Sequence, residues 1–441
     1  MFETFRNAWK LPDLRRKILF TLFIIIIFRI GSAIPVPFLD ASVLGQWMSS
    51  QGGGNFLSYM DILSGGALSK ATLFAMSVTP FINAQIIIQL LTFAIPPLER
   101  LSKEGESGRK KIAKVTDITG FALAAFQAWA YYLTLRRATV DGKSAVVYTS
   151  GFEGIFSAIV IIACFTAGAS LIVWLGNRIN EKGIGNGISM ILFAGIIARG
   201  PSAVLSMIKL IGTDTKYVFV VPIVLVIFVL MIGFIVLMNA SERRIPIQYA
   251  KRVVGRKQYG GQNTHIPIKV AMSGVMPIIF ASSFMQIPST LGLFFPPSPT
   301  GDGFWHDFYV GFLNFFNFQS PWYAILYFLL IIAFNYFYVG MQYNPIEIAN
   351  NLRQSNGGIP GIRPGKPTSD FIHRVLSKIT LVGAFFLGVI AVFPILFSMA
   401  IPSLNIAMGG TSILIIVSVA LETVRTLESQ MMMRHHKGFL E

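Results

Sequence analysis

The chain has 441 residues, of which 54% are hydrophobic and only 13% are charged, and its mean hydropathy is +0.64. Soluble globular proteins carry about 25% charged residues, so this composition excludes a water-soluble globule and predicts a polytopic membrane protein. The formal net charge is +16, and the basic residues that produce it gather in particular loops.

Apolar runs recur along the chain at the length of about 20 residues that a spanning helix needs. They centre on residues 18–37, 76–96, 116–136, 153–175, 186–208, 217–239, 267–295, 320–341, 375–397 and 407–426. We therefore expect an all-α polytopic membrane protein with about ten transmembrane helices. The first run could instead be a signal-peptide core with a cleavage site at 31–33, but Pro35 and Pro37 favour the end of a retained helix.

Loops rich in Lys and Arg alternate with loops that lack them. Basic residues crowd the segment before the first run, the segment after the second, and loops 241–266 and 342–370, whereas loops 296–319 and 398–406 have none. Basic loops stay on the cytoplasmic side, so we expect both termini in the cytoplasm, as an even number of spans also requires. The basic residues after span three, Arg136, Arg137 and Lys143, run against this pattern.

Residues 56–75 are apolar but do not fit the pattern of spanning helices. Gly65 and Gly66 interrupt the run, and Asp61 and Lys70 add charges within it. Broken backbone at membrane depth is tolerated only where protein buries it or where it lines a cavity. The segment is therefore either an external re-entrant loop or a stopper inside a pore, and the residues alone leave both open.

Two of the predicted helices carry polar side chains at lipid depth. These are Asn83, Gln85 and Gln89 in span two and Ser282, Ser283 and Gln286 in span seven. Gln85 and Gln89 are four residues apart and share a helix face, so structural hydrogen bonds to another helix are the default interpretation. Because Pro80 opens span two and Pro277 lies within span seven, a movable seam between two kinked helices is the alternative.

No motif for catalysis, nucleotide binding or metal binding is complete. Residues 361–366 resemble a P-loop, but the glycine spacing is one residue short and Pro367 follows the lysine. Cys164 is the only cysteine, and the five histidines are scattered, with only His435 and His436 close together. We therefore expect no enzyme activity, no metal and no cofactor.

The two basic loops contain turn signals as well as charge. Residues 357–365 alternate turn-forming residues with isoleucines, which predicts a rigid tip that presents Arg363. Positive-inside topology and contact with anionic lipids account for the basic residues. Docking of an acidic partner or of an RNA backbone is the alternative.

Six motifs follow one another along the chain: LSGGALSKATLFAMSVTPFINAQIIIQLL from Leu63, KEGESGRKK from Lys103, GIGNGIS from Gly183, GVMPIIFASS from Gly274, PGIRPG from Pro360 and GGTSILIIV from Gly409. In this order they resemble the SecY family, the channel subunits of the bacterial Sec protein translocase. The resemblance covers about residues 10–430. It implies two inverted, pseudo-symmetric halves, 1–211 and 212–441, around a central pore and hinged between spans five and six.

The same resemblance implies four groups of site residues. An apolar pore ring would consist of Val78, Ile82, Leu192, Met276, Ile279 and Ile415. Segment 56–75 would be a short plug helix that includes Leu63, Ser64, Gly65, Gly66, Ala67, Leu68, Leu73 and Phe74. A lateral gate, between spans two and three on one side and seven and eight on the other, would include Asn83, Gln85, Gln89, Ser282, Ser283 and Gln286. Partner binding would fall on Arg256, Lys257 and Arg363.

By this resemblance the chain would pass unfolded secretory polypeptides across the cytoplasmic (inner) membrane and release membrane segments laterally into it. The ATPase SecA or a ribosome would drive transport, the small subunits SecE and SecG would pack against the spans, and anionic lipids would contact the basic loops. The residues alone keep two further hypotheses open. One is a secondary transporter of a small solute, and the other is a membrane scaffold without a pore.

Overall fold

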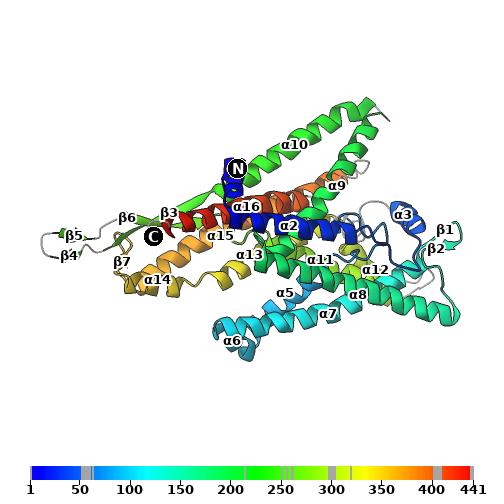
Figure 1. Ribbon diagram of the computed structural model, residues 1–441, viewed down its shortest axis with the longest axis horizontal. Helices are drawn as coiled ribbons and strands as arrows, with labels where there is room; N and C mark the ends of the chain where they lie inside the picture. Colours follow the sequence, from blue (N-terminus) through cyan, green and yellow to red (C-terminus); the bar gives the residue numbers. More distant parts are fainter. Residues whose placement is uncertain are drawn as a thin grey trace.

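The computed structural model describes residues 2–50, 61, 64–212, 215–249, 252–254, 257–259, 263–295, 304–317, 320–400 and 410–437. Most of these residues are helical, and the long helices run roughly along the longest axis of the molecule (Figure 1). A narrow β-hairpin extends from one end. Helices α9 and α10 diverge from the rest of the bundle on one side (Figure 1).

A helix lies at each of the ten positions where the sequence predicts a span. These helices are α2 (Pro12–Gly31), α5 (Thr79–Ala94), α7 (Glu106–Arg137), α8 (Gly151–Lys182), α9 (Gly187–Ile211), α10 (Thr215–Ala240), α11 (Met276–Phe294), α13 (Pro321–Gln342), α15 (Lys366–Ala400) and α16 (Gly410–Lys437). Shorter helices are α1 (Phe2–Lys10), α3 (Ala41–Ser50), α6 (Pro96–Lys103), α12 (Phe304–Phe315) and α14 (Pro345–Gln354).

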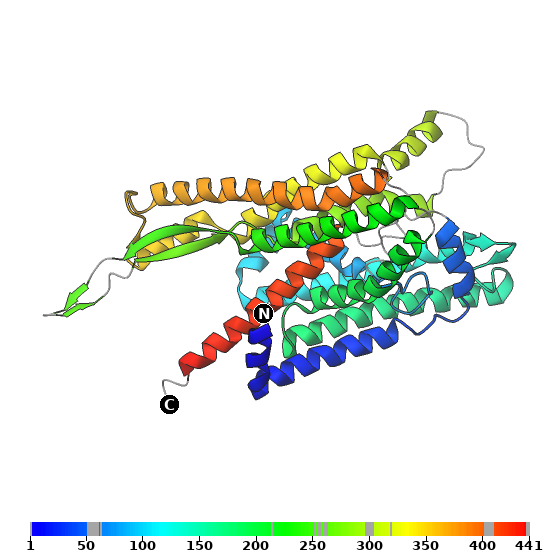
Figure 2. The same ribbon diagram turned by 90° about the horizontal axis from the view of Figure 1, so that it is seen from above.

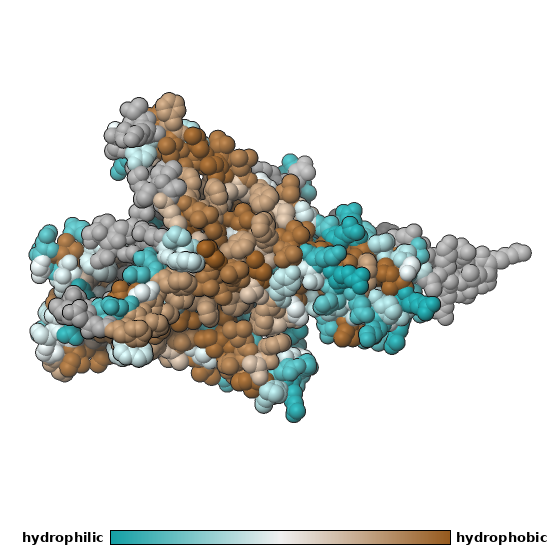
Figure 3. All heavy atoms as spheres, turned by 180° about the vertical axis from the view of Figure 1, so that it is seen from behind, coloured by the Kyte–Doolittle hydropathy of each residue, from teal (hydrophilic) through white to brown (hydrophobic). Residues whose placement is uncertain are grey.

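Within the described ranges, six helices are long and apolar enough to cross a membrane by themselves. The number rises to seven if α5 and α6, which meet at a bend of 100°, are one broken span. The bend follows from Pro96 and Pro97, because a proline disfavours helical backbone in the residue before it. A broad apolar band nevertheless crosses the middle of the molecule between two hydrophilic ends (Figure 3).

The structure corrects two predicted span boundaries. The first span ends at Gly31 rather than at residue 37, since residues 32–40 form turns and isolated bridges. The seventh begins at Met276 rather than at residue 267, because residues 263–269 pair as a strand. Pro277 consequently lies in the first turn of α11, where a proline is tolerated, and Pro288 is the proline inside the helix.

The two basic loops are structured. Strands β3 (Glu242–Tyr249) and β6 (Asn263–Lys269) pair antiparallel, and β7 (Gly357–Gly358) adds to the other edge of β3. Beyond them, β4 (Arg252–Val254) pairs with β5 (Lys257–Tyr259) at the tip of the hairpin. A separate small hydrophobic cluster packs this sheet against α14 and α15, so the two loops form one unit at one end of the molecule (Figure 2). At the opposite end, β1 (Thr139–Val140) and β2 (Lys143–Ser144) form a short hairpin.

Candidate functional site

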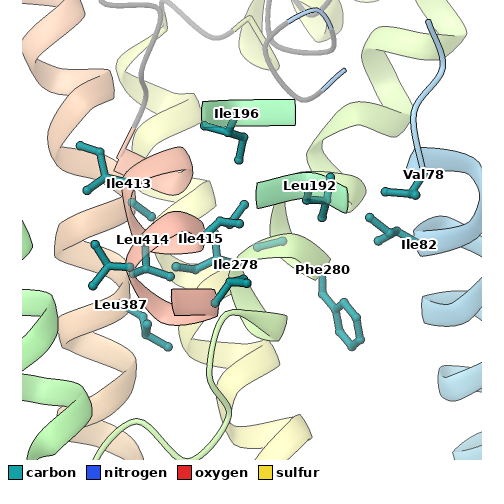
Figure 4. Packing of buried hydrophobic residues seen from close by; sticks show 14 of the residues in the cluster. Val78, Ile82, Leu192, Ile196, Ile278, Phe280, Leu387, Ile413, Leu414 and Ile415 are labelled. Carbon is teal, nitrogen blue, oxygen red and sulfur yellow. The ribbon is translucent and has the colours of Figure 1, made fainter. Parts of the chain in front are cut away.

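The largest hydrophobic cluster lies at the centre of the helical bundle and contains every residue predicted for the pore ring. Val78, Ile82, Leu192 and Ile415 are each less than a tenth exposed, and Met276 and Ile279 are half-buried and pack against them. Val78 and Ile82 lie at the start of α5, Leu192 on α9 and Ile415 on α16, and these side chains approach one another from different sides (Figure 4).

The chemistry of this cluster is uniformly apolar. The residues predicted for the pore ring, which come from α5, α9, α11 and α16, have no hydrogen-bonding group in their side chains. If these side chains line a pore, they would resist the entry of water and ions, because a narrow apolar passage tends to stay dry. It also gives a polypeptide that passes through it nothing polar to bind.

Of the expected plug, the structure describes Asp61 and residues 64–75, and residues 64–75 consist of turns. Gly65, Gly66 and Ala71 have positive φ angles of 70°, 84° and 51°, which interrupt a helix. The helix therefore does not extend over residues 64–75, whereas Asp61 is helical. Positions 56–60, 62 and 63, including Leu63, lie outside the described residues. We call Asp61 together with residues 64–75 the plug segment.

The later part of the plug segment is fixed to the bundle by backbone contacts. Leu73 N donates to Ile34 O at 3.0 Å, and Val36 N donates to Ala71 O at 2.9 Å. A Cβ atom added at Gly168 of α8 would lie 2.0 Å from Leu73 O, so the segment can approach α8 this closely only because residue 168 is a glycine.

Phe74 anchors the same part of the plug segment. Its ring is stacked on Phe28 of α2 at a centroid distance of 5.7 Å and is 1% exposed. A Cβ atom at Gly31 would lie 2.1 Å from the Phe74 ring. Leu68 and Ala67 are equally buried, and Leu68 packs in a second cluster with Val43 and Leu44 of α3. We call the surfaces of α2, α3, α8 and α9 that contact the plug segment the plug seat.

The expected lateral gate is the seam where α5 and α7 meet α11 and α13. Aromatic rings from the two sides are in contact near both ends of this seam. Phe126 of α7 stacks on Phe294 of α11 at 4.6 Å, and Phe93 of α5 meets Phe337 of α13 edge-on at 5.7 Å. These ring contacts involve no charged group.

The polar side chains predicted for the gate behave differently from one another. Ser282, Ser283 and Gln286 are buried, Asn83 and Gln89 are half-buried, and Gln85 is exposed. The buried oxygens Asn83 Oδ1, Gln89 Oε1 and Gln286 Oε1 have no hydrogen-bond partner among the described residues. The structural hydrogen bond expected of Gln85 and Gln89 is therefore not made by the Gln89 oxygen in this structure.

Arg363 is exposed at the tip that the sequence predicts. Gly361 and Gly365 flank it with φ angles of 81° and 100°, and its carbonyl accepts a hydrogen bond from Thr368 Oγ1 at 2.8 Å. Ile359 and Ile362 pack into the small cluster beneath the tip. Lys257 begins β5, and Arg256 lies outside the described residues.

Sequence reasoning missed an ion pair at the plug seat. Arg199 of α9 lies 2.7 Å from Asp61, measured from Nη1 to Oδ2. Both residues stand in otherwise apolar stretches, and an ionisable residue at membrane depth is expected to have a partner. That rule flags each residue separately, but it cannot pair two positions so distant in the chain.

A multi-pass helical membrane protein whose spans converge on an apolar constriction is the class that this fold and site define. The SecY family matches residues 72–424 of the chain. The translocase subunit SecY of Streptomyces galbus is 41% identical over 443 residues, with full coverage of both chains.

Solved structures of channels share this fold. A SecY structure in which the plug domain is described as stabilising the closed state and maintaining a membrane seal has a TM-score of 0.64, with 17% identity and 96% coverage of each chain. Sec61 in a canine ribosome-channel complex has a TM-score of 0.59, with 15% identity and 96% coverage of each chain.

The chain belongs to the SecY family of protein translocase subunits. As a member of this family it is a multi-pass membrane protein that forms a protein-conducting channel, and it is not an enzyme.

Proposed function

We propose that the pore ring is the point at which unfolded secretory polypeptides cross the cytoplasmic membrane. The observation that carries this proposal is the meeting of Val78, Ile82, Leu192 and Ile415 from three separate helices in one apolar cluster (Figure 4). Aliphatic side chains form no hydrogen bonds, so a chain of any sequence can slide past them. The same side chains keep the closed constriction dry.

The two halves, 1–211 and 212–441, would move about a hinge between α9 and α10 to open the ring and the gate together. The gate would part between α5 and α7 on one side and α11 and α13 on the other. The unpartnered amide oxygens on α5 and α11 support this location, because burying them without a partner weakens the closed seam. A sufficiently hydrophobic segment of the substrate would then partition through the gate into lipid.

Energy for transport would come from a cytoplasmic partner, the ATPase SecA or a ribosome. Arg363, together with Arg256 and Lys257 of the neighbouring loop, would bind that partner. The exposure of Arg363 on a turn whose Ile359 is buried and whose Ile362 is partly buried supports this role. Anionic lipids would contact the remaining basic side chains.

The small subunits SecE and SecG would cover apolar helices of this chain. Helix α10 has the smallest buried share of the six candidate spans, and its Phe219 and Val229 are 72% and 67% exposed. Both termini would lie in the cytoplasm. Thr4 Oγ1 donates to Glu428 Oε1 at 3.1 Å, which places the beginning of the chain beside the end of α16.

The central experiment introduces a photoreactive residue at Ile279 and offers a stalled, signal-bearing polypeptide to the reconstituted translocase with its cytoplasmic motor. We expect a covalent adduct between residue 279 and the polypeptide. If the polypeptide engages the complex and crosslinks elsewhere but never at residue 279, the position of the pore is wrong.

Arg363→Glu tests the docking tip. Reversing the charge opposes any acidic partner surface, and truncation or reversal of one partner in a charge pair costs about 2–5 kcal/mol, so we expect nearly complete loss of polypeptide transport with normal membrane insertion. Transport into vesicles is the measurement. Arg353→Glu, an exposed arginine on α14 of the same loop, is the matched control and should retain transport.

A further inference from the structure

We propose that the ion pair between Asp61 and Arg199 is the latch that keeps the plug segment in its seat while the channel is idle. The proposal rests on the function proposed above and assigns positioning roles to two residues that lie outside the ring and the gate. We call this ion pair the plug latch.

The plug latch is short and buried. Arg199 Nη1 lies 2.7 Å from Asp61 Oδ2, and the side chain of Asp61 is 5% exposed, whereas that of Arg199 is 27% exposed. A carboxylate this deeply buried is costly unless it is paired, and removal of one partner from a buried pair is strongly destabilising. Asp61 can therefore stay in the seat only while a cation neutralises it.

The two carboxylate oxygens of Asp61 contact different groups. Oδ1 accepts a hydrogen bond from Ser69 N at 2.8 Å within the plug segment, and Oδ2 contacts Arg199. The Asp61 carbonyl also accepts from Gly66 N at 2.8 Å and from Ser64 Oγ at 3.1 Å. The same residue thus organises the turns of the plug segment and connects them to α9.

The face of α9 that bears Arg199 lies very close to the backbone of the plug segment. Gly195 lies four residues earlier on the same helix face, and a Cβ atom at Gly65 would lie 2.7 Å from Gly195 O. Glycine on both sides brings the plug segment against the α9 backbone, where Arg199 can reach Asp61. Leu192 of the pore ring lies on α9 two turns before Arg199. A movement of α9 that widened the ring would therefore also move Arg199 relative to Asp61.

A second arginine serves as an internal control. Arg29 Nη1 would lie 3.1 Å from a Cβ atom at Gly65, so its guanidinium group is also beside the plug segment. In the part of the chain that the structure describes, Arg29 forms no ion pair, and its side chain is exposed. Arg29 and Arg199 thus place similar charge near the plug segment, but only Arg199 is paired with its carboxylate.

The test measures the ion conductance of the full-length chain, purified with its associated subunits, in planar lipid bilayers without a translocating polypeptide. Four single variants are compared with the unsubstituted protein: Arg199→Gln, Asp61→Asn, Arg199→Lys and Arg29→Gln. Asp61→Asn retains an oxygen that can accept from Ser69 N, so it removes the ion pair while preserving the local turn. The double variant Asp61→Asn with Arg199→Gln removes both charges and leaves no buried ion unpaired.

The expected conductance of each variant depends on which charge the substitution leaves without a partner. Arg199→Gln leaves a buried carboxylate unpaired and should raise the idle conductance most, by about tenfold or more. Asp61→Asn leaves an arginine that is partly exposed and should raise it less. The double variant should conduct less than Arg199→Gln alone, because the buried charge is gone. Arg199→Lys retains the positive charge and should raise the idle conductance only slightly. Arg29→Gln should conduct about as little as the unsubstituted protein.

Three results would overturn the plug latch: unchanged conductance in Arg199→Gln and Asp61→Asn, an equal increase in Arg29→Gln, or a double variant whose effect is the sum of the single effects. Polypeptide transport by the unsubstituted protein is measured in the same preparation. If that transport fails, the proposed channel function fails as well. If transport is normal and the idle conductance does not change when the ion pair is removed, only the plug latch is wrong.

Discussion

In the proposed channel, the plug seat and the gate seam would both contribute to closure, but their contacts differ. At the plug seat, the structure shows an ion pair, backbone hydrogen bonds and glycines that admit close approach. At the gate seam it shows stacked or edge-on aromatic rings and buried amide oxygens without partners. Directional contacts resist small displacements, whereas apolar contacts tolerate sliding. On the proposed function, we therefore expect the plug segment to be held in one position and the gate seam to separate more easily.

Phe74→Ala should produce the largest loss of stability, because it removes a 1% exposed ring that fills the plug seat. Truncation of a buried phenylalanine to alanine typically costs about 3–5 kcal/mol. The thermal unfolding midpoint of the purified protein measures this cost. Phe74→Leu keeps most of the apolar volume and should cost clearly less. Equal midpoints for Phe74→Ala and the unsubstituted protein would show that the ring contact does not stabilise the seat.

Gly168→Ala should destabilise the plug seat by overpacking. The added methyl group would lie 2.0 Å from the Leu73 carbonyl oxygen, so either α8 or the plug segment must shift, at a cost of about 1–3 kcal/mol. The thermal midpoint should fall and the idle conductance should rise. Gly233→Ala in α10 is the matched control, because its added methyl group meets no atom within 4 Å. It should not lower the thermal midpoint, since alanine favours a helix more than glycine does, and it should leave the idle conductance unchanged.

At the gate seam, Gln286→Met should raise the stability of the protein, whereas the two substitutions at the plug seat should lower it. The Gln286 side chain is 7% exposed and its Oε1 atom has no partner among the described residues. Replacing an unsatisfied buried polar group with an apolar one of similar length should stabilise the closed seam by about 1–3 kcal/mol. We expect a higher thermal midpoint and slower lateral release of a membrane segment. Gln286→Glu should lower the midpoint, and a fall in both variants would contradict the unpartnered state of this amide.

The smallest effect is expected at α3, which forms part of the plug seat. Asp40 Oδ1 accepts hydrogen bonds from Ser42 Oγ at 2.6 Å and from Ser42 N at 2.9 Å, and these bonds lower the pKa of the Asp40 carboxyl below its usual value. A lowered pKa means that the stabilisation is present above the unfolded value of about 3.9 and is lost as pH falls toward the folded value.

Hydrogen exchange of residues 41–48 measures this contribution. Asp40→Ala should exchange about fivefold faster at neutral pH, and Asp40→Asn, which keeps the accepting oxygen, should exchange nearly as slowly as the unsubstituted protein. Faster exchange throughout the chain in Asp40→Ala, rather than in α3 alone, would contradict a purely local cap.

Local patterns in the sequence predicted much of the fold. Runs of apolar residues identified ten helix positions, and glycines alternating with isoleucines located the tip that carries Arg363. These features depend on residues close together in the chain, so their pattern is readable without the fold. The start of α11 was predicted at residue 267 because residues 267–275 are mostly apolar, but residues 267–269 end strand β6, which pairs with β3, and residues 270–275 form turns.

The ring depended on a different kind of information. Val78 and Ile82 share a helix face that periodicity reveals, but Leu192 and Ile415 join them from α9 and α16, and only the resemblance to a known family proposed that grouping before the structure placed them in one cluster. The gate amides were identified from their polarity at lipid depth. Whether their oxygens found partners depended on the distance between helices.

The sequence by itself determined that the protein is a polytopic membrane protein, where its helices approximately lie, which loops are basic, and that no catalytic motif is complete. Each of these follows from composition or from patterns among residues close together in the chain. The tertiary structure decided which buried groups meet. Asp61 is paired with Arg199 because segments distant in the chain pack against one another. For the same reason Leu73 lies close to the backbone at Gly168, and the Phe74 ring lies close to Gly31. These contacts arise from the packing of whole helices, which no local pattern encodes.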